Sequence, residues 1–329
     1  MKSVRWGILS TAKIGLEHLI PAIDASDFGT VHAIASRDEK KADEEARKLN
    51  IPLSYGSYEE LLVDESVDAI YNPLPNHLHV PWTLKAMEAG KHVLCEKPIG
   101  LDSDEAELLL NKTREFPDLK VMEAFMYRFH PQWERVLSLI GSGEIGTLES
   151  IHSVFTYFND DPKNIRNWPH MGGGGLMDIG CYCISVSRLL FGKEPDRVSG
   201  ELDIDPGYGV DRKASGILSF GDKTATFTCS TKVENYQHVL IYGSDGLIEV
   251  EKPFNPQGDK TAFIHLTKQG ERKTIEIEAV DQFRLQVDRF CQSIINNTAV
   301  PTPLEDSVAN MKVIDAVFKS GKKSSSQLV

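Results

Sequence analysis

A lysine stands where an open α/β sheet presents its reactive side chains. Residues 95–98 read Cys-Glu-Lys-Pro and come at the carboxyl end of a strand expected over 92–97. That end of a parallel sheet is where ligands bind. The ammonium of Lys97 can donate a hydrogen bond to a substrate hydroxyl and lower the pKa of a neighbouring acidic group. The alternative is a surface lysine in a turn.

The first turn from a strand into a helix has the composition of a phosphate-binding loop. The strand expected over 3–9 runs into Ser-Thr-Ala-Lys-Ile-Gly at 10–15. Of the three glycines in G-x-G-x-x-G, only Gly15 is present. Small residues still let the backbone approach a pyrophosphate, and a helix N-terminus favours an anion. A tight turn without a ligand is the alternative. The residues expected to bind a dinucleotide here are Ser10, Thr11, Ala12 and Ile14.

The end of the second strand indicates which dinucleotide is preferred. An acid at this point binds the ribose 2′-hydroxyl, whereas an arginine accepts a 2′-phosphate. Here the strand ends at Arg37, which can clamp a phosphate with two hydrogen bonds, and the acids at 38 and 39 come only after it. We therefore expect NADP(H) in preference to NAD(H), with a solvated charge at a helix start as the alternative. The residues expected at the 2′-phosphate are Ser36, Arg37, Lys40 and Lys41.

The elements that must position these residues alternate between strands and helices. Apolar spacing predicts a doubly wound parallel sheet, the Rossmann arrangement, over residues 1–122. The expected strands are 3–9, 30–36, 67–72, 92–97 and 120–125, and the expected helices are 13–24, 38–49, 76–89 and 102–116.

The chain changes character after about residue 122. Consecutive strand-like runs joined by short turns predict an α+β domain over 123–329 with an open, mostly antiparallel sheet. We expect this domain to bind substrate and to mediate oligomerisation. The expected strands are 148–158, 212–220, 223–232, 237–242, 246–250, 262–268 and 273–278, and the expected helices are 175–191, 281–297 and 304–320.

Composition excludes several classes of function. The 329 residues carry 36 Lys and Arg against 48 Asp and Glu, a net charge of −12, which disfavours binding to nucleic acid or anionic membranes. We see neither a secretory signal nor an 18-residue apolar run. The five cysteines form no CxxC pair, so we expect no metal site. We also expect a cytoplasmic location, where cysteine thiols stay reduced. His77-x-His79 resembles a ligand pair only superficially.

The ordered motifs together resemble one family. After Tyr-Gly-Ser-Tyr-Glu-Glu-Leu-Leu at 55–62 come Asn-Pro-Leu-Pro-Asn-His at 72–77, Glu-Lys-Pro at 96–98, and Glu-Ala-Phe-Met-Tyr-Arg-Phe-His-Pro at 123–131. The glycine run 172–175 then leads into Leu-Met-Asp-Ile-Gly-Cys-Tyr. In this order, over essentially the whole chain, they resemble the Gfo/Idh/MocA family of sugar and polyol oxidoreductases.

The resemblance implies three catalytic residues. Lys97 would contact the substrate hydroxyl, Asp178 would orient the substrate, and Tyr182 would transfer the proton. A four-residue spacing puts Asp178 and Tyr182 on one helix face. Many members have His at the last of these positions. With Tyr182 there, this sequence resembles the branch of the family that includes glucose–fructose oxidoreductase, dimeric dihydrodiol dehydrogenase and aldose dehydrogenases. Because a free tyrosine has a pKa of about 10, we expect the Lys97 ammonium to stabilise its phenolate.

Further residues are expected at the cofactor and the substrate. In the family, the loop after the third expected strand lines the nicotinamide ribose. Core packing or solvated charge is the alternative for the substrate group. The further cofactor residues are Tyr55, Pro73, Leu74, Asn76, His79, Glu96 and Lys97. The substrate candidates are Phe125, Arg128, Tyr157, Asn164, Arg166 and Trp168.

We therefore expect an NADP-dependent enzyme that oxidises a monosaccharide of the xylose or glucose type at C1. One alternative is a carbonyl reductase or dehydrogenase for a ketosugar or a trans-dihydrodiol. Another, of a different class, is a non-catalytic NADP-binding regulatory protein. The resemblance also implies a homodimer or homotetramer formed through the C-terminal sheet.

Overall fold

The computed structural model describes residues 3–323 and 325–329. It divides into two compact units. Unit 1 comprises Met1–Met126 with Gln282–Val308, and unit 2 comprises Tyr127–Asp281 with Ala309–Val329.

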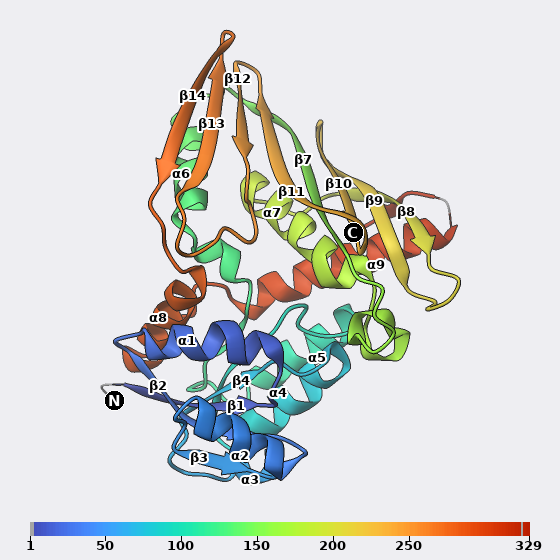
Figure 1. The fold of residues 1–329 in the computed structure, drawn as a ribbon. Helices are drawn as coiled ribbons and strands as arrows, with labels where there is room; N and C mark the ends of the chain where they lie inside the picture. Colours follow the sequence, from blue (N-terminus) through green and yellow to red (C-terminus); the bar gives the residue numbers. More distant parts are fainter. Residues whose placement is uncertain (1–2, 324) are drawn as a thin grey trace. The chain divides into compact units, whose positions relative to one another are not determined.

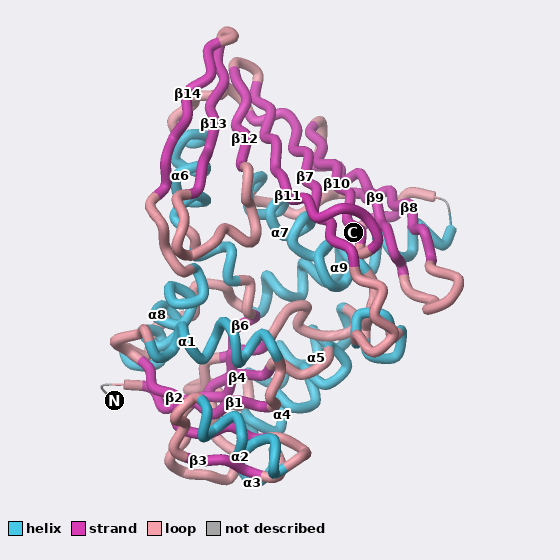
Figure 2. The backbone as a smooth tube through the Cα atoms, viewed as in Figure 1, coloured by secondary structure: helices cyan, strands magenta, loops and turns pink. Residues whose placement is uncertain are grey.

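Unit 1 is built on a six-stranded sheet in the order β3-β2-β1-β4-β5-β6, with its strands in magenta in Figure 2. Every neighbouring pair of strands is parallel. The predicted doubly wound sheet is confirmed. Its strands are β1 (Val4–Leu9), β2 (Gly29–Ala35), β3 (Leu53–Tyr55), β4 (Ala69–Asn72), β5 (His92–Cys95) and β6 (Val121–Glu123). Its helices are α1 (Ile20–Asp24), α2 (Glu39–Lys48), α3 (Tyr58–Leu62), α4 (His79–Glu88), α5 (Ser103–Thr113) and α8 (Gln282–Ile295).

Side-chain caps fix where several of these helices begin. Asp38, Ser57 and Asp102 each accept a hydrogen bond from the amide three residues later, at the starts of α2, α3 and α5. Such caps satisfy amides that a helix start leaves without partners. The sequence prediction omitted β3 and α3, which are only three and five residues long.

Helix α8 corrects the predicted division at residue 122, which put it in the second domain. It belongs to unit 1, where Phe290 packs 5.6 Å from the ring of the fully buried Trp6. Phe283 stacks on His18, and Asp288 accepts a 2.6 Å hydrogen bond from Ser26. The first strand therefore obtains part of its apolar cover from a helix near the other end of the chain.

Unit 2 contains a nine-stranded sheet in the order β14-β13-β12-β11-β7-β10-β9-β8-β15 (Figure 1). Only the β7–β10 pair is parallel in this part of the described chain, which confirms the mostly antiparallel prediction. The strands are β7 (Leu148–Phe158), β8 (Arg197–Ile204), β9 (Asp211–Phe220), β10 (Lys223–Ser230), β11 (Lys232–Gly243), β12 (Gly246–Val250), β13 (Ala262–Lys268), β14 (Glu271–Ile277) and β15 (Gln327–Leu328).

One face of this sheet carries the core of unit 2. Alternate residues of β7 and β10, such as Phe155 and Phe227, are buried, and α7 (Cys181–Phe191) packs on both strands. Helix α6 (Pro131–Gly141) packs on β13. The longest helix is α9 (Leu304–Lys323), within which the division between the units falls.

The segment Pro169–Phe191 is long and apolar enough to cross a membrane by length and composition alone. It includes the charged residues Asp178 and Arg188, so it is not a continuous apolar run of 18 residues. Its most apolar window of 18 residues is 89% buried inside the protein. It is the core helix of unit 2, and its apolar character follows from burial.

Candidate active site

The turn after β1 keeps the shape of a phosphate loop although two of its glycines are replaced. Ser10 adopts a φ of +72°, in the left-handed region that usually favours glycine. Its hydroxyl accepts a hydrogen bond from the Ala12 amide at 3.2 Å. The chain then enters a π-helical turn at Gly15. Ser10, Thr11, Ala12 and Ile14 are all half-buried in this turn, at the strand end where a dinucleotide would lie.

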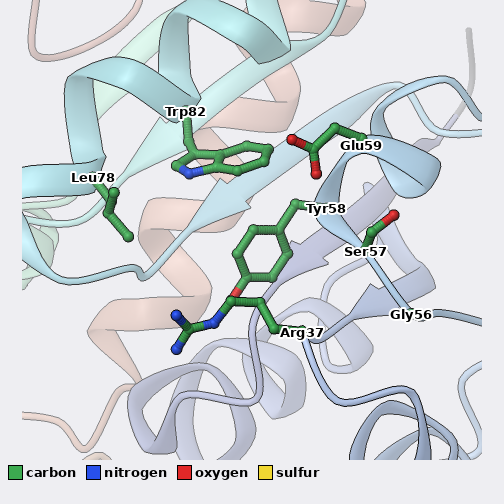
Figure 3. A pocket seen from close by; sticks show the side chains of 7 residues that line it. All are labelled: Arg37, Gly56, Ser57, Tyr58, Glu59, Leu78 and Trp82. Carbon is green, nitrogen blue, oxygen red and sulfur yellow. The ribbon is translucent and has the colours of Figure 1, made fainter.

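A pocket of about 370 Å³ opens beside the end of β2 in unit 1 (Figure 3). Tyr58 lies between Trp82 and Arg37. The Tyr58 and Trp82 rings meet edge to face at 4.9 Å. Burial raises the pKa of the Tyr58 hydroxyl, and the positive charge of Arg37 opposes that rise. The lining residues are Arg37, Gly56, Ser57, Tyr58, Glu59, Leu78 and Trp82.

Acids near this pocket are engaged elsewhere. Glu59 pairs with Lys85 at 3.0 Å, and the Lys85 ammonium also lies 3.9 Å from the centre of the Trp82 ring. Asp38 caps α2. The pocket thus combines flat aromatic surface with the Arg37 guanidinium.

Tyr55, predicted at the cofactor, does not line this pocket, whereas Tyr58 does. The Tyr55 hydroxyl donates a 2.9 Å hydrogen bond to Asp64. Ser36 is 7% exposed, and its hydroxyl accepts from the Asp38 amide at 3.2 Å. Lys40 and Lys41 are exposed in the first turn of α2 and do not line the pocket.

The loops after β4 and β5 are tied together beneath Lys97. The buried imidazole of His79 lies between two backbone carbonyls, 2.7 Å from that of Pro98 and 2.6 Å from that of Leu74. Glu96 accepts a 2.7 Å hydrogen bond from the Tyr71 hydroxyl and a 3.3 Å bond from the Lys97 amide. Lys97 is half-buried. The backbone of its turn is held by the hydrogen bond of its own amide to Glu96 and by the contact of the Pro98 carbonyl with His79.

The side chain of His79 lies in the core of unit 1, where it is 1% exposed. Its place at the nicotinamide ribose stays a prediction. Burial lowers its pKa to about 4. Pro73 and Leu74 are also buried, whereas Asn76 is half-exposed. Within residues 3–323 and 325–329, no three His, Cys, Asp or Glu side chains form a group that could hold a metal ion. The His77-x-His79 pair is therefore not part of such a group.

Unit 2 brings together three of the predicted residues, Tyr157, Arg166 and Asp178. The Asp178 side chain lies at the centre and the residue is 8% exposed. The Tyr157 hydroxyl donates a 2.5 Å hydrogen bond to Asp178 Oδ2. Arg166 Nε lies 2.8 Å from Oδ1 of the same carboxylate. The negative charge of Asp178, followed by those that Tyr157 and Tyr182 would carry if ionised, raises the pKa of the Arg166 guanidinium further.

Tyr182 lies one helical turn after Asp178, at the start of α7. Its ring is 4% exposed and packs among Tyr127, Phe155 and Phe254 at centroid distances of 5.5–5.7 Å. Because the interaction with Arg166 is mutual, the guanidinium favours a Tyr182 phenolate. The predicted pairing of Asp178 and Tyr182 on one helix thus acquires a cation that sequence spacing did not identify as their partner.

The remaining candidates have structural partners. Phe125 is fully buried in unit 1, and its role at the substrate stays a prediction. Arg128 donates a 3.0 Å hydrogen bond to the Ser185 hydroxyl of α7. Asn164 caps the turn that carries Arg166, and Trp168 is 41% exposed with its indole N–H donated to the Pro162 carbonyl.

Two family models match the chain. The model described as "Oxidoreductase family, NAD-binding Rossmann fold" matches residues 4–123, and the model of the GFO/IDH/MocA C-terminal domain matches residues 133–249. Both matches follow the order of the motifs along the chain.

Relatives align over nearly the full length. An uncharacterized oxidoreductase, ORF334, from Rhizobium meliloti is 42% identical over 98% of both chains. D-xylose 1-dehydrogenase (NADP⁺) 2 from Haloferax volcanii is 38% identical over 96% of this chain and 97% of its own. Among solved structures, the 3-ketoreductase KijD10 from Actinomadura kijaniata, in complex with NADP and TDP-benzene, has a TM-score of 0.92 and 30% identity over 97% of this chain and 98% of its own.

Family models that match both parts of the chain and relatives that align over nearly its full length agree with the fold. The chain is a member of the Gfo/Idh/MocA family of oxidoreductases.

Proposed function

We propose that this protein is an NADP-dependent dehydrogenase that oxidises an aldose of the D-xylose or D-glucose type at C1, with Lys97, Asp178 and Tyr182 as its catalytic residues. The observation that carries the proposal is the cluster around Asp178, where Tyr157 and Arg166 hold the carboxylate one helical turn before Tyr182. The NADP⁺-dependent D-xylose dehydrogenase among the relatives supports the choice of substrate.

The pocket beside Arg37 fits the adenosine end of NADP(H). Its Tyr58 and Trp82 rings offer apolar surface to a purine, and a guanidinium suits a 2′-phosphate because it can donate two parallel hydrogen bonds. An acid in the pocket would favour the 2′-hydroxyl of NAD(H). Among the described lining residues, Glu59 is the one acid, and it forms an ion pair with Lys85. When bound, the nicotinamide of this cofactor accepts or donates the hydride.

The chain's own residues would manage the proton and the orientation of the sugar. Tyr182 removes the proton of the hydroxyl being oxidised, and returns it in the reverse direction. The positive charge of Arg166, which lies in the same unit, favours the phenolate form of Tyr182. Lys97 would contact the substrate hydroxyl. Asp178 would orient the sugar through its carboxylate, which Tyr157 and Arg166 hold in place.

A coupled screen tests this proposal. Purified protein is incubated with NADP⁺ or NAD⁺ and a panel of aldoses, polyols and inositols, and the absorbance of the reduced cofactor is followed. We expect turnover with an aldopentose or aldohexose, a higher kcat/KM with NADP⁺, and loss of turnover in Lys97→Met and Tyr182→Phe. Full turnover in both variants would remove the catalytic assignment.

A second candidate is reduction of a ketosugar, which the 3-ketoreductase relative favours. It would appear as NADPH consumption with keto-sugars and no NADPH formation with aldoses. A trans-dihydrodiol substrate belongs to the same assay. Inert behaviour in both directions, with NADP(H) bound, would instead indicate the non-catalytic regulatory protein.

We also propose association of copies through the face of the unit 2 sheet opposite α7. Its exposed side chains include Ile217, Tyr236 and Tyr242, and apolar and aromatic groups of this kind are typical of interfaces. Light scattering on the purified protein should give a dimer or tetramer, and a monomer would refute the proposal.

A further inference from the structure

The helical segment that carries Asp178 begins without a cap of its own. Its first turn, Leu176–Gly180, follows the glycine run 172–175, and Gly175 at the cap position has no side chain to accept a hydrogen bond. A helix start leaves amide groups without intrahelical partners. In a buried segment such amides need acceptors from elsewhere.

Asp211, from the start of β9, supplies the acceptor. Its Oδ2 accepts a 2.6 Å hydrogen bond from the Leu176 amide. Asp211 is 2% exposed. It therefore caps a helix that begins 35 residues earlier in the chain, and a negative charge is favoured at that end of a helix.

The glycine run is shaped around this carboxylate. Gly174 has a φ of +116°, and a Cβ there would lie 2.1 Å from Asp211 Oδ1. At Gly173 a Cβ would lie 2.4 Å from the Arg166 carbonyl oxygen, which accepts a 2.9 Å hydrogen bond from the Gly174 amide. The glycines thus lie between Asp211 and the backbone of Arg166.

We propose that Asp211 is a positioning residue for the oxidoreduction, fixing the start of the segment that carries Asp178 and Tyr182. The proposal rests on the function proposed above. The Asp178 amide donates a 3.0 Å hydrogen bond to the Gly174 carbonyl, so a shift of Gly174 moves Asp178 directly. Tyr182 follows on the same continuous helix.

The electrostatics agree with a retained positional role. Burial raises the pKa of Asp211 to about 7, with the nearby charge of Asp178 acting in the same direction and the amides of Leu176, Asp211 and Gly175 opposing it. A carboxylate in this position is therefore costly to ionise. The hydrogen bond that Asp211 accepts from the backbone explains why a carboxyl group is buried beside the glycine run.

The test compares Asp211→Ala and Asp211→Asn with wild type, Tyr182→Phe and a matched control. The control is Ser320→Ala, which removes another buried acceptor of a backbone amide in unit 2, that of Gly200 at 2.9 Å. For each folded protein, kcat and KM for the best aldose, the Kd of NADPH by fluorescence, and thermal stability are measured.

We expect Asp211→Ala to lower kcat at least tenfold while the Kd of NADPH, which unit 1 would bind, stays within twofold of wild type. Asp211→Asn should recover part of the loss, because its amide oxygen can still accept from Leu176. Ser320→Ala should change thermal stability without lowering kcat. Amide hydrogen exchange at 174–178 should accelerate in Asp211→Ala, whatever the substrate.

The outcomes separate this inference from the proposed function. If Tyr182→Phe loses turnover while Asp211→Ala keeps full kcat and unchanged exchange, the role of Asp211 is refuted and the proposed function stands. Wild-type protein without turnover in either direction would overturn the proposed function and with it the positioning role of Asp211 in the reaction. If Asp211→Ala does not fold, the same comparison is decided by Asp211→Asn, for which wild-type kcat and exchange would count against the inference.

Discussion

Arg166 Nε lies 2.8 Å from Asp178 Oδ1, and this ion pair joins the loop before the glycine run to the helical turn after it. Tyr157 occupies the other oxygen of the carboxylate at 2.5 Å. Asp178 is thus held in one orientation from two sides. The Arg166 charge also favours the phenolate of Tyr182, so the ion pair affects both the orienting acid and the proposed base.

Replacing Arg166 with Met should lower kcat/KM by about 10- to 100-fold, the range expected when a charged hydrogen-bond partner worth about 1.5–3 kcal/mol is lost. The rise of kcat/KM with pH in the oxidative direction should move to higher pH, because loss of the cation raises the pKa of Tyr182. The measurement is the pH profile of kcat/KM. Arg212→Met, which removes an exposed ion pair with Asp203, is the control. A profile unchanged from wild type would contradict the role of Arg166.

Tyr157→Phe should lower kcat/KM by up to about tenfold, because one hydrogen bond to the Asp178 carboxylate is lost while the ion pair with Arg166 remains. We expect kcat/KM for the sugar to fall and the KM for the cofactor to stay unchanged. A double-mutant cycle with Asp178→Asn measures the coupling directly. Additive effects of the two substitutions would show that the hydroxyl acts independently of Asp178.

Tyr58→Phe should weaken the preference for NADP⁺ several-fold, because the Arg37 guanidinium loses the polar hydroxyl with which it interacts beside the pocket. The KM for NADP⁺ is expected to rise and that for NAD⁺ to stay close to wild type. Tyr55→Phe provides a matched control, since the Tyr55 hydroxyl bonds Asp64 and does not line the pocket. An equal change in both tyrosine variants would place the effect outside the pocket.

His79 should make the protein less stable as the pH falls from about 6.5 to about 4. Its pKa is lowered to about 4 in the folded chain, against about 6.5 in an unfolded one. The unfolded state therefore binds more protons in this window, and its stability contribution, on the order of 3 kcal/mol at full strength, is lost as the pH falls. Above pH 6.5 that contribution is fully present.

The measurement is the difference in free energy of unfolding between wild type and His79→Gln at several pH values. Asp211, with its pKa raised to about 7, acts in the opposite sense over an overlapping range, because the folded state then binds the extra proton. Taking the difference between the two proteins cancels that contribution. A difference that does not vary between pH 4 and 7 would show that His79 is not held neutral.

The sequence by itself determined the chemistry-bearing residue types and the elements that carry them. Apolar periodicity predicted both sheets, since burial on one or two faces imposes that periodicity. The strand 148–158 has the predicted bounds. The Glu-Lys-Pro turn and the four-residue spacing from Asp178 to Tyr182 are local patterns, and a helix places such a pair on one face wherever it packs.

Only the tertiary structure decided the partners of these residues. Asp211 meets the glycine run through a contact across 35 residues, and α8 joins unit 1 from the far end of the chain. Side-chain direction within a short element decided that Tyr58 rather than Tyr55 lines the pocket, and packing between two loops buried His79. Local sequence sets what a residue can do, but burial, charge neighbours and hydrogen-bond partners come from segments that only folding brings together.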